Sequence, residues 1–228
     1  MNQSFLSGAK RSVPILFSAA PFGVLFGAVA IDNGLSVFQT VLMSLTVYAG
    51  ASQMVGIELF GHHAAPWLIA FSIFVVNARH VLYSATIGRH FENFTNLQKS
   101  LAFFFLIDPQ FAESEREIDR VGKIDFQWYI GMGLSFYSMW FCATLLGALF
   151  GKILPDAHTW GIDFLLSIYF LALVMGFRKR PLWLPVVLVS GVASVFFYKT
   201  IGSPWHVSLG ALVGITYAAI FGAGEVKS

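Results

Sequence analysis

Long stretches without a charged residue constrain this chain more than any other feature. Six of them contain 18 to 26 residues each and cover 12–31, 33–57, 59–78, 126–151, 181–198 and 200–224. A helix rises about 1.5 Å per residue, so each stretch can cross about 30 Å of hydrocarbon. The runs are continuous, whereas barrel strands would be segments of about ten residues with alternating polarity. The pattern predicts an all-α integral membrane protein.

Composition excludes a soluble globular domain and a disulfide-linked scaffold. Of the 228 residues 57% are hydrophobic and 11% are charged, whereas soluble domains have about 25% charged residues. The single cysteine, Cys142, excludes an internal disulfide. The formal net charge of +2 gives no reason to expect a nucleic-acid partner. The lipid bilayer is therefore the expected environment, and no metal or other cofactor is expected.

One polytopic membrane domain is expected over residues 1–228, with about seven transmembrane helices. The expected spans cover about 12–31, 34–57, 65–87, 127–151, 160–177, 181–198 and 203–222, with Asp163 near the membrane interface. Residues 100–112 are also apolar, but they reach only about 20 Å as a helix. This segment is expected to be re-entrant or half-length.

Positive charge does not choose between seven spans and eight. With seven spans and a cytoplasmic C-terminus, nine Lys and Arg residues lie inside and four lie outside. Counting 100–112 as an eighth span again gives nine and four, so both arrangements satisfy the positive-inside rule. Both also place the loop 113–125, the basic cluster 178–180 and the C-terminus in the cytoplasm.

A short repeat favours seven spans. Gly-Val-Leu-Phe-Gly at 23–27 returns as Gly-Ala-Leu-Phe-Gly at 147–151. With seven spans the two helices run in opposite directions, as in the inverted repeats of secondary transporters, and with eight they run in parallel. The alternative is chance, because Gly-x-x-x-Gly allows close packing of membrane helices in general. Pro21, Gly23 and Gly27 either kink the first span or serve packing alone.

The second span has a polar centre that contains Tyr48, Gly50, Ser52 and Gln53. A Gly flanked by such side chains is a place where a membrane helix can break and offer backbone groups to a ligand. The alternative is packing of small residues against a neighbouring helix, with Gln53 hydrogen-bonded to it.

The third span ends in a polar cluster. Asn77, Arg79, His80, Tyr83 and Ser84 share one arc of about 160° at 100° per residue. Such a face must look into the helix bundle or a wet cavity. The alternatives are an interfacial anchor for Arg79 and an ordinary hydrogen-bonded interior position for His80.

A carboxylate, Asp108, ends the Phe-rich segment. If it lies within the bilayer, Asp108 and His80 are candidates for proton coupling. If it opens the following loop, it is solvated and has no such role.

Four motifs together carry a resemblance to a known family. They are Pro21-x-Gly23-x-x-x-Gly27, Tyr48-Ala49-Gly50-Ala51-Ser52-Gln53, Asn77-x-Arg79-His80-x-x-Tyr83-Ser84 and Leu106-x-Asp108. With these motifs the chain resembles, from about Gly8 to Phe221, the azaleucine-resistance (AzlC-type) family, the large subunits of bacterial branched-chain amino acid exporters.

The resemblance implies a multi-pass permease of the bacterial inner membrane and not an enzyme. It implies export of valine, leucine, isoleucine or methionine coupled to protons, together with a small membrane subunit of about four spans. The family usually has a second acid directly after the motif aspartate, whereas here Asp108 is followed by Pro109 and Gln110. A proton relay that needs two carboxylates therefore lacks one of them.

A zwitterionic substrate suggests roles for the polar residues. Its carboxylate needs a cation or a helix N-terminus, and its ammonium needs an acid or carbonyl groups. We expect Arg79 or the backbone amides near Gly50 to hold the carboxylate. Asp108 and the carbonyls of 48–53 are expected to hold the ammonium, and 103–105 to form part of an apolar wall.

Two other functions remain open from the residues alone. One is the substrate-binding membrane component of an energy-coupled vitamin importer, which would bind tightly without net transport. The other is an intramembrane hydrolase, with Ser52 or Ser84 as nucleophile and His80 as base. Neither serine lies in a Gly-x-Ser-x-Gly elbow.

Overall fold

The computed structural model describes residues 3–61, 63–150, 171, 174–202 and 205–222, and these residues form helices joined by short connections. The helices are α1 (Gln3–Asp32), α2 (Val37–Thr46), α3 (Gly50–Gly61), α4 (Pro66–Asn77), α5 (Arg79–Ile87), η1 (Gly88–Phe91), α6 (Asn96–Phe104), α7 (Asp108–Val121), α8 (Phe126–Phe150), α10 (Trp183–Thr200) and α11 (Trp205–Gly222). Most of the expected span 160–177 lies outside the described residues.

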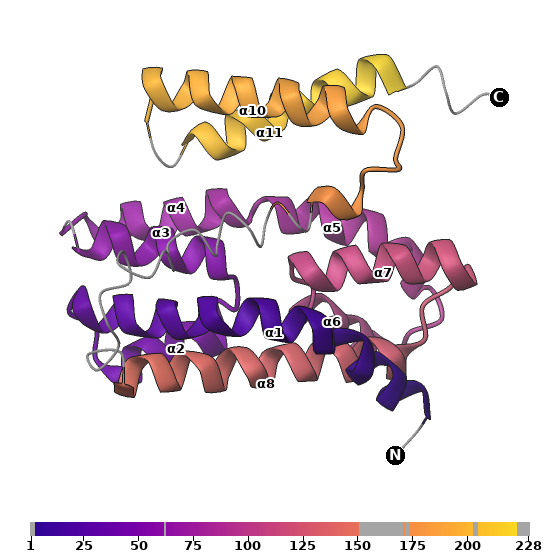
Figure 1. Cartoon of the computed structure of the whole chain (residues 1–228), viewed down its shortest axis with the longest axis horizontal. Coiled ribbons are helices and arrows are strands. Elements are labelled where there is room, and N and C mark those ends of the chain that lie inside the picture. The colour runs from indigo at the N-terminus through magenta and orange to yellow at the C-terminus, as the bar shows by residue number, and fades with distance from the viewer. Residues whose placement is uncertain (1–2, 62, 151–170, 172–173, 203–204, 223–228) are drawn as a thin grey trace.

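The described helices are those of an integral membrane protein. Four stretches are long and apolar enough to cross a bilayer, namely Gln3–Asp32, Pro66–Phe91, Phe126–Phe150 and Trp183–Thr200. The third of these is the helix α8, and the second combines α4, α5 and η1. In Figure 1 these stretches all run roughly along the long axis of the molecule.

The helices α1 and α8 pack against each other along their length and run in parallel. Gly8 faces Trp128, Gly23 faces Ala143, and Gly27 faces Thr144. An added Cβ at Gly27 would overlap the α8 backbone, so these glycines permit the close approach. The parallel direction corrects the expectation that the two Gly-x-x-x-Gly helices oppose each other. The reason lies in 34–57, which the sequence indicated to be a single span.

Residues 34–57 do not cross the molecule but form part of a helical hairpin. The helix α2 has 10 residues and α3 has 12, which correspond to about 15 and 18 Å. The chain turns at 47–49, and Gly56 then faces Met43 while Gly61 faces Asn33. The hairpin therefore returns to the end where α1 finishes. Among the described residues between α1 and α8 in the sequence, one stretch crosses the molecule, Pro66–Phe91.

A second hairpin comes from the opposite end and contains the half-length segment 100–112. The helix α6 runs inward along α8, where the rings of Phe94 and Phe126 lie 5.3 Å apart and Tyr129 Oη donates to the Ala102 carbonyl at 2.9 Å. After a turn at 105–107, α7 runs back towards the start of α1. Figure 1 shows the tips of both hairpins near the middle of the molecule.

The two hairpins begin with the same local signal. Ser36 accepts from the Gln39 backbone N–H while the Gln39 side chain accepts from the Ser36 backbone, which is a capping box at the start of α2. Thr95 and Gln98 form the same box at the start of α6. The box satisfies amides that a helix start leaves free. The inverted relation in this fold therefore lies between the hairpins and not between the glycine motifs.

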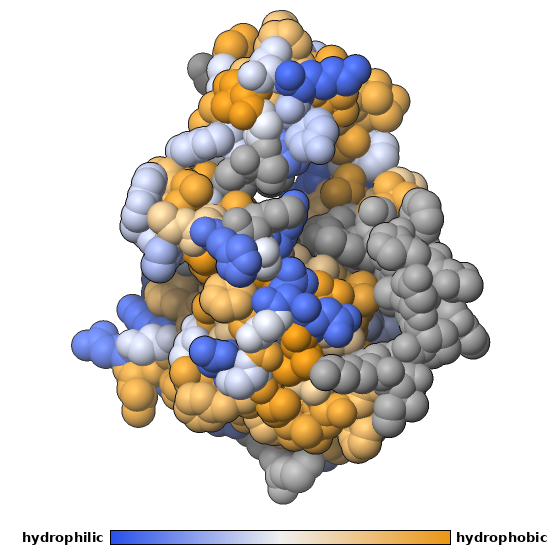
Figure 2. All heavy atoms as spheres, turned by 90° about the vertical axis from the view of Figure 1, so that its left-hand side faces the viewer, coloured by the Kyte–Doolittle hydropathy of each residue, from blue (hydrophilic) through white to orange (hydrophobic). Residues whose placement is uncertain are grey.

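Basic residues gather at one end, here called the basic end. Ten of the described Lys and Arg residues lie there, namely Lys10, Arg11, Arg89, Lys99, Arg116, Arg120, Lys123, Arg178, Lys179 and Arg180. Lys199 closes α10 at the other end. Figure 2 looks onto that other end and shows hydrophilic patches set in a largely hydrophobic surface.

Candidate functional site

A cavity lies where the tips of the two hairpins meet α1 and α8. Its water-accessible volume is about 40 Å³, within about 480 Å³ of space that includes the opening to the surroundings. Its lining comes from four parts of the chain: Ala19, Phe22, Tyr48, Ala49, Gly50, Ala51, Ile107, Asp108, Pro109, Phe136, Met139 and Trp140. The two tips contribute equivalent positions, since Gly50 begins α3 and Asp108 begins α7.

Asp108 is the charged group of this cavity, and it is already paired. Arg79 Nη2 lies 3.1 Å from its Oδ2, and the Tyr83 hydroxyl donates to its Oδ1 at 2.9 Å. The side chains of Arg79 and Asp108 are only 25% and 17% exposed, so water screens the pair weakly. The predicted polar arc of α4 and α5 thus meets the predicted acid of α7.

Arg79 is one of the two groups expected to hold a substrate carboxylate, and in this structure it is paired with Asp108. The guanidinium neutralises Asp108 and does not line the cavity. The other expected ligand for a substrate carboxylate was the set of amides near Gly50, and Gly50 and Ala51 do line it. Amides in the first turn of a helix have no partner within the helix and carry the positive end of its dipole. The cavity therefore combines a carboxylate with a helix N-terminus.

Asn77 and His80 lie behind the ion pair and not in the cavity lining. His80 Nδ1 is 3.1 Å from the Asn77 carbonyl oxygen, and its ring stands edge-on to Tyr83 with centroids 5.6 Å apart. Tyr83 in turn bonds to Asp108. His80 is thus connected to the carboxylate through one aromatic residue.

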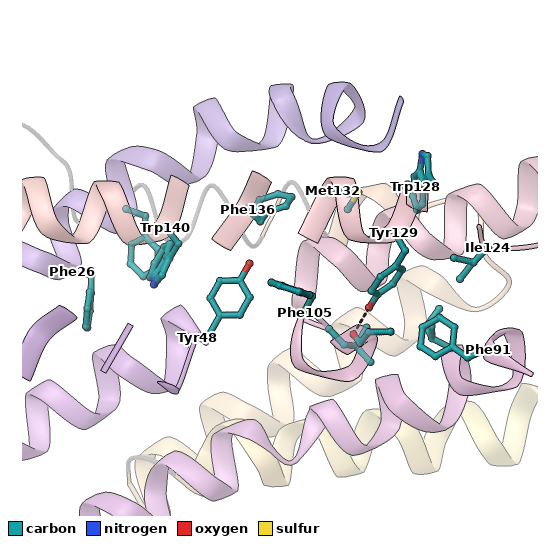
Figure 3. Packing of buried hydrophobic residues seen from close by; sticks show 14 of the residues in the cluster. Phe26, Tyr48, Phe91, Phe105, Ile124, Trp128, Tyr129, Met132, Phe136 and Trp140 are labelled. Carbon is teal, nitrogen blue, oxygen red and sulfur yellow. Dashed lines mark hydrogen bonds between the residues drawn. The ribbon is translucent and has the colours of Figure 1, made fainter. Parts of the chain in front are cut away.

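Tyr48 joins the tips of the two hairpins. It has a left-handed backbone, with φ of 43°, which is unfavourable for a residue with a side chain. Its ring stacks on Phe104 at 6.1 Å and stands edge-on to Tyr137 at 4.9 Å. Figure 3 shows Tyr48 between Trp140 and Phe105. The expected break of the second span occurs here. Tyr137 Oη donates to the Leu45 carbonyl at 3.1 Å, so this carbonyl near the break has a hydrogen-bond partner.

Ser52 and Gln53 are fully buried and lie outside the cavity lining. The Ser52 hydroxyl donates to the Ala49 carbonyl within the same turn. The Gln53 amide donates to Ser44 Oγ at 3.0 Å and accepts from Trp140 Nε1 at 3.2 Å. In this structure both residues bond to the protein, and their contact with substrate stays a prediction.

The remaining predictions concern α1 and the apolar wall. Gly23 and Gly27 pack α1 against α8, while Pro21 lies on the exposed face of the continuous helix α1. The expected wall of 103–105 does not line the cavity. The aromatic residues that do are Phe22, Phe136 and Trp140, on α1 and α8. No local pattern in the sequence marks these three residues, because aromatic residues occur throughout the apolar spans.

Ion pairs fasten α7 at the basic end. Glu113 has a side chain that is 4% exposed, and it bonds to Arg11 of α1 at 2.6 Å and to Arg116 of its own helix. Arg180 bonds to Asp119 at 3.0 Å and to Glu115 at 3.2 Å. In the described part of the chain, no group of three or more His, Cys, Asp and Glu side chains is arranged to hold a metal ion.

Comparisons with known proteins agree on a membrane transport family. The AzlC protein family matches residues 14–154, which is more than half of the chain. The inner membrane protein YgaZ of Escherichia coli (strain K12) is 29% identical over 86% of this chain and 83% of its own length. An uncharacterized membrane protein of Archaeoglobus fulgidus is 30% identical over 96% of this chain and 92% of its own length.

A further relative carries a functional name. The branched-chain amino acid transport protein AzlC of Bacillus subtilis (strain 168) is 22% identical over 75% of this chain and 66% of its own length. The comparison with solved structures found no match.

Proposed function

Because the chain belongs to the AzlC family of membrane transport proteins, we propose that it is a secondary transporter subunit that exports branched-chain amino acids. The substrates are valine, leucine and isoleucine, with methionine as a further candidate, and export is coupled to protons across the bacterial inner membrane. One observation carries the proposal. The tips of two oppositely directed hairpins meet at a cavity that holds a carboxylate, a helix N-terminus and apolar walls.

The substrate binds across the two tips. Its carboxylate accepts hydrogen bonds from the first amides of α3 at Gly50 and Ala51, at the positive end of the helix dipole. Its ammonium bonds to Asp108 at the start of α7. Its branched side chain lies against Phe22 and Trp140, because an aliphatic group needs an apolar surface.

Binding requires an exchange at Asp108. The substrate ammonium replaces Arg79 or shares the carboxylate with it, so occupancy of the cavity is linked to the position of α5. A proton is the competing cation. His80 is its carrier, because a hydrogen bond from Nδ1 to the Asn77 carbonyl leaves Nε2 free to accept a proton.

The basic end faces the cytoplasm in this proposal, in accord with the positive-inside rule. The start of α1 lies at this end, so the N-terminus is cytoplasmic. The C-terminus, which the sequence also indicates to be cytoplasmic, lies outside the described residues. A small membrane subunit of about four spans completes the transporter.

Counterflow in proteoliposomes tests the function. Vesicles that contain the chain, with and without a candidate small subunit, are loaded with unlabelled leucine and assayed for uptake of labelled leucine. We expect counterflow that Asp108→Asn lowers at least about 30-fold, because removal of one partner of a buried charge pair costs about 2–5 kcal/mol. Glu58→Gln is the matched control, since it removes an exposed carboxylate of α3 outside the cavity lining.

Three outcomes would contradict the proposal. Absence of counterflow with and without the small subunit removes the transport of leucine. Equal counterflow for Asp108→Asn and Glu58→Gln removes the role of the cavity. Efflux from leucine-loaded vesicles that does not respond to an imposed pH gradient removes proton coupling.

A further inference from the structure

We propose that Trp140 determines which side chains the cavity accepts and that Gln53 is the positioning residue that holds Trp140 in place. The inference rests on the proposed function, because it concerns the substrate of the same cavity. Trp140 lies on α8, is 8% exposed and forms part of the lining. Its indole is thus the largest side chain that a substrate meets there.

The indole ring contacts two aromatic rings of α1 and the tip of the first hairpin. Phe22 lies against it at 5.6 Å between ring centroids, and Phe26 stacks on it at 6.1 Å. The ring edge points to the tip of the first hairpin. A Cβ added to Gly50 would lie 3.0 Å from Trp140 Cη2 and 2.8 Å from Phe22 Cε1. Gly50, Phe22 and Trp140 therefore set the width of the cavity at this point.

A chain of buried hydrogen bonds fixes the polar atom of the indole. Trp140 Nε1 donates to Gln53 Oε1, Gln53 Nε2 donates to Ser44 Oγ, and Ser44 Oγ lies 2.9 Å from Thr144 Oγ1. Because an indole N–H only donates, the Gln53 amide can take one orientation, with its oxygen towards Trp140. This series of hydrogen bonds begins at Trp140 and ends at Thr144, one turn apart on α8. It passes through Gln53 of α3 and Ser44 of α2, the two helices of the first hairpin.

This geometry explains why Gln53 lies within a substrate motif without reaching the cavity. Removal of its amide would leave the buried indole N–H without a partner, which is unfavourable in a water-poor interior. The ring would then leave its fixed place, and the cavity would lose its defined width. A wall fixed in this way would favour branched aliphatic substrates over larger aromatic ones.

The experiment measures leucine counterflow in competition with unlabelled valine, leucine, methionine and phenylalanine. Trp140→Phe opens space, so we expect the preference for leucine over phenylalanine to fall about tenfold or more, since misfit in an apolar pocket changes selection by about 10 to 200-fold. Gly50→Ala narrows the same point, and we expect the preference for valine over leucine to rise. Trp128→Phe is the matched control, because Trp128 is buried on the same helix outside the lining.

A double-mutant cycle separates positioning from general damage. Gln53→Leu should lower the leucine to phenylalanine preference in the wild-type background but not in the Trp140→Phe background, where no indole N–H remains. An equal further fall in both backgrounds overturns the role of Gln53.

The outcomes also separate this inference from the proposed function. If the wild type transports leucine but neither Trp140→Phe nor Gly50→Ala changes the preference, the inference is wrong and the function stands. If Trp128→Phe changes the preference as much as Trp140→Phe does, the inference is likewise wrong and the function stands. If the wild type transports no amino acid, the proposed function itself is wrong.

Discussion

The two hairpins share one design but are fastened by different chemistry. Each begins with a capping box and breaks after a short helix. The first hairpin is bound to α8 by neutral, buried hydrogen bonds through Ser44 and Gln53. The second also has neutral hydrogen bonds to α8, between Tyr129 and both Ala102 and Gln110. It adds ion pairs of Arg79 with Asp108 and of Arg11 with Glu113.

In the proposed transport function, the difference gives the two tips different tasks. Neutral hydrogen bonds hold one geometry and do not respond to salt, so the first hairpin presents fixed amides and supports a fixed wall. An ion pair can exchange its cation for another, so the second hairpin presents a carboxylate whose partner can change. A substrate with both charges needs one tip of each kind.

The largest expected effect comes from leaving the acid of the second tip without its cation. Arg79→Met should lower stability strongly, because breaking one side of a buried pair costs about 3–5 kcal/mol. Arg79→Met with Asp108→Asn should recover most of the melting temperature without recovering leucine counterflow. Thermal unfolding in detergent measures the melting temperature, and an assay in proteoliposomes measures leucine counterflow. Recovery of both would remove Asp108 from the transport site.

A smaller effect is expected from Glu113, where α7 meets α1. Glu113→Gln removes two charged interactions and should cost about 1–3 kcal/mol. The wild-type melting temperature should fall with added NaCl more than that of the variant, because salt screens the pair. A variant with the same salt dependence as the wild type would show that these ion pairs do not fasten the second hairpin.

The neutral hairpin should behave differently in the same measurement. Ser44→Ala leaves the Gln53 amide N–H without its acceptor and should cost about 1–2 kcal/mol. Here the difference from the wild type should stay constant between low and high NaCl. If the difference instead shrinks with salt, the contrast between the hairpins is wrong.

The smallest effect is expected from Arg180, whose side chain is 48% exposed. Arg180→Gln should change stability by about 1 kcal/mol or less, because exposed ion pairs contribute little. A loss equal to that of Glu113→Gln would show that the segment after 176 is as important for the second hairpin as α1 is.

Much of the fold follows from the sequence because the bilayer restricts it. Continuous apolar runs predicted helices, and Gly50 between polar residues predicted a break where the chain turns at 47–49. The return of the chain was missed, since 34–57 has the length of a span and length does not distinguish a span from a hairpin. The matching boxes at Ser36 and Thr95 are the local signal for two equivalent hairpins.

The sequence indicated which residues belong to the site, but it did not indicate which of them pair with each other. Arg79, Tyr83 and Asp108 are costly in a membrane, and this made them candidates. Their contact depends on how α5 and α7 pack, which periodicity within one helix does not give. Trp140 was missed because an aromatic residue in an apolar span is usually in contact with lipid, and only the partner at Gln53 distinguishes it.

Substrate protection of a cysteine at the junction of the tips tests the central claim most directly. Cys142, the single native cysteine, is replaced by Ser, and Ala51→Cys places a thiol in the cavity lining, with Lys123→Cys in the exposed loop after α7 as control. In a variant that retains leucine counterflow, we predict that saturating leucine slows thiol labelling at position 51 about tenfold and leaves labelling at position 123 unchanged. Labelling at position 51 that leucine does not slow, in a protein that still transports leucine, would contradict a substrate site between the two hairpins.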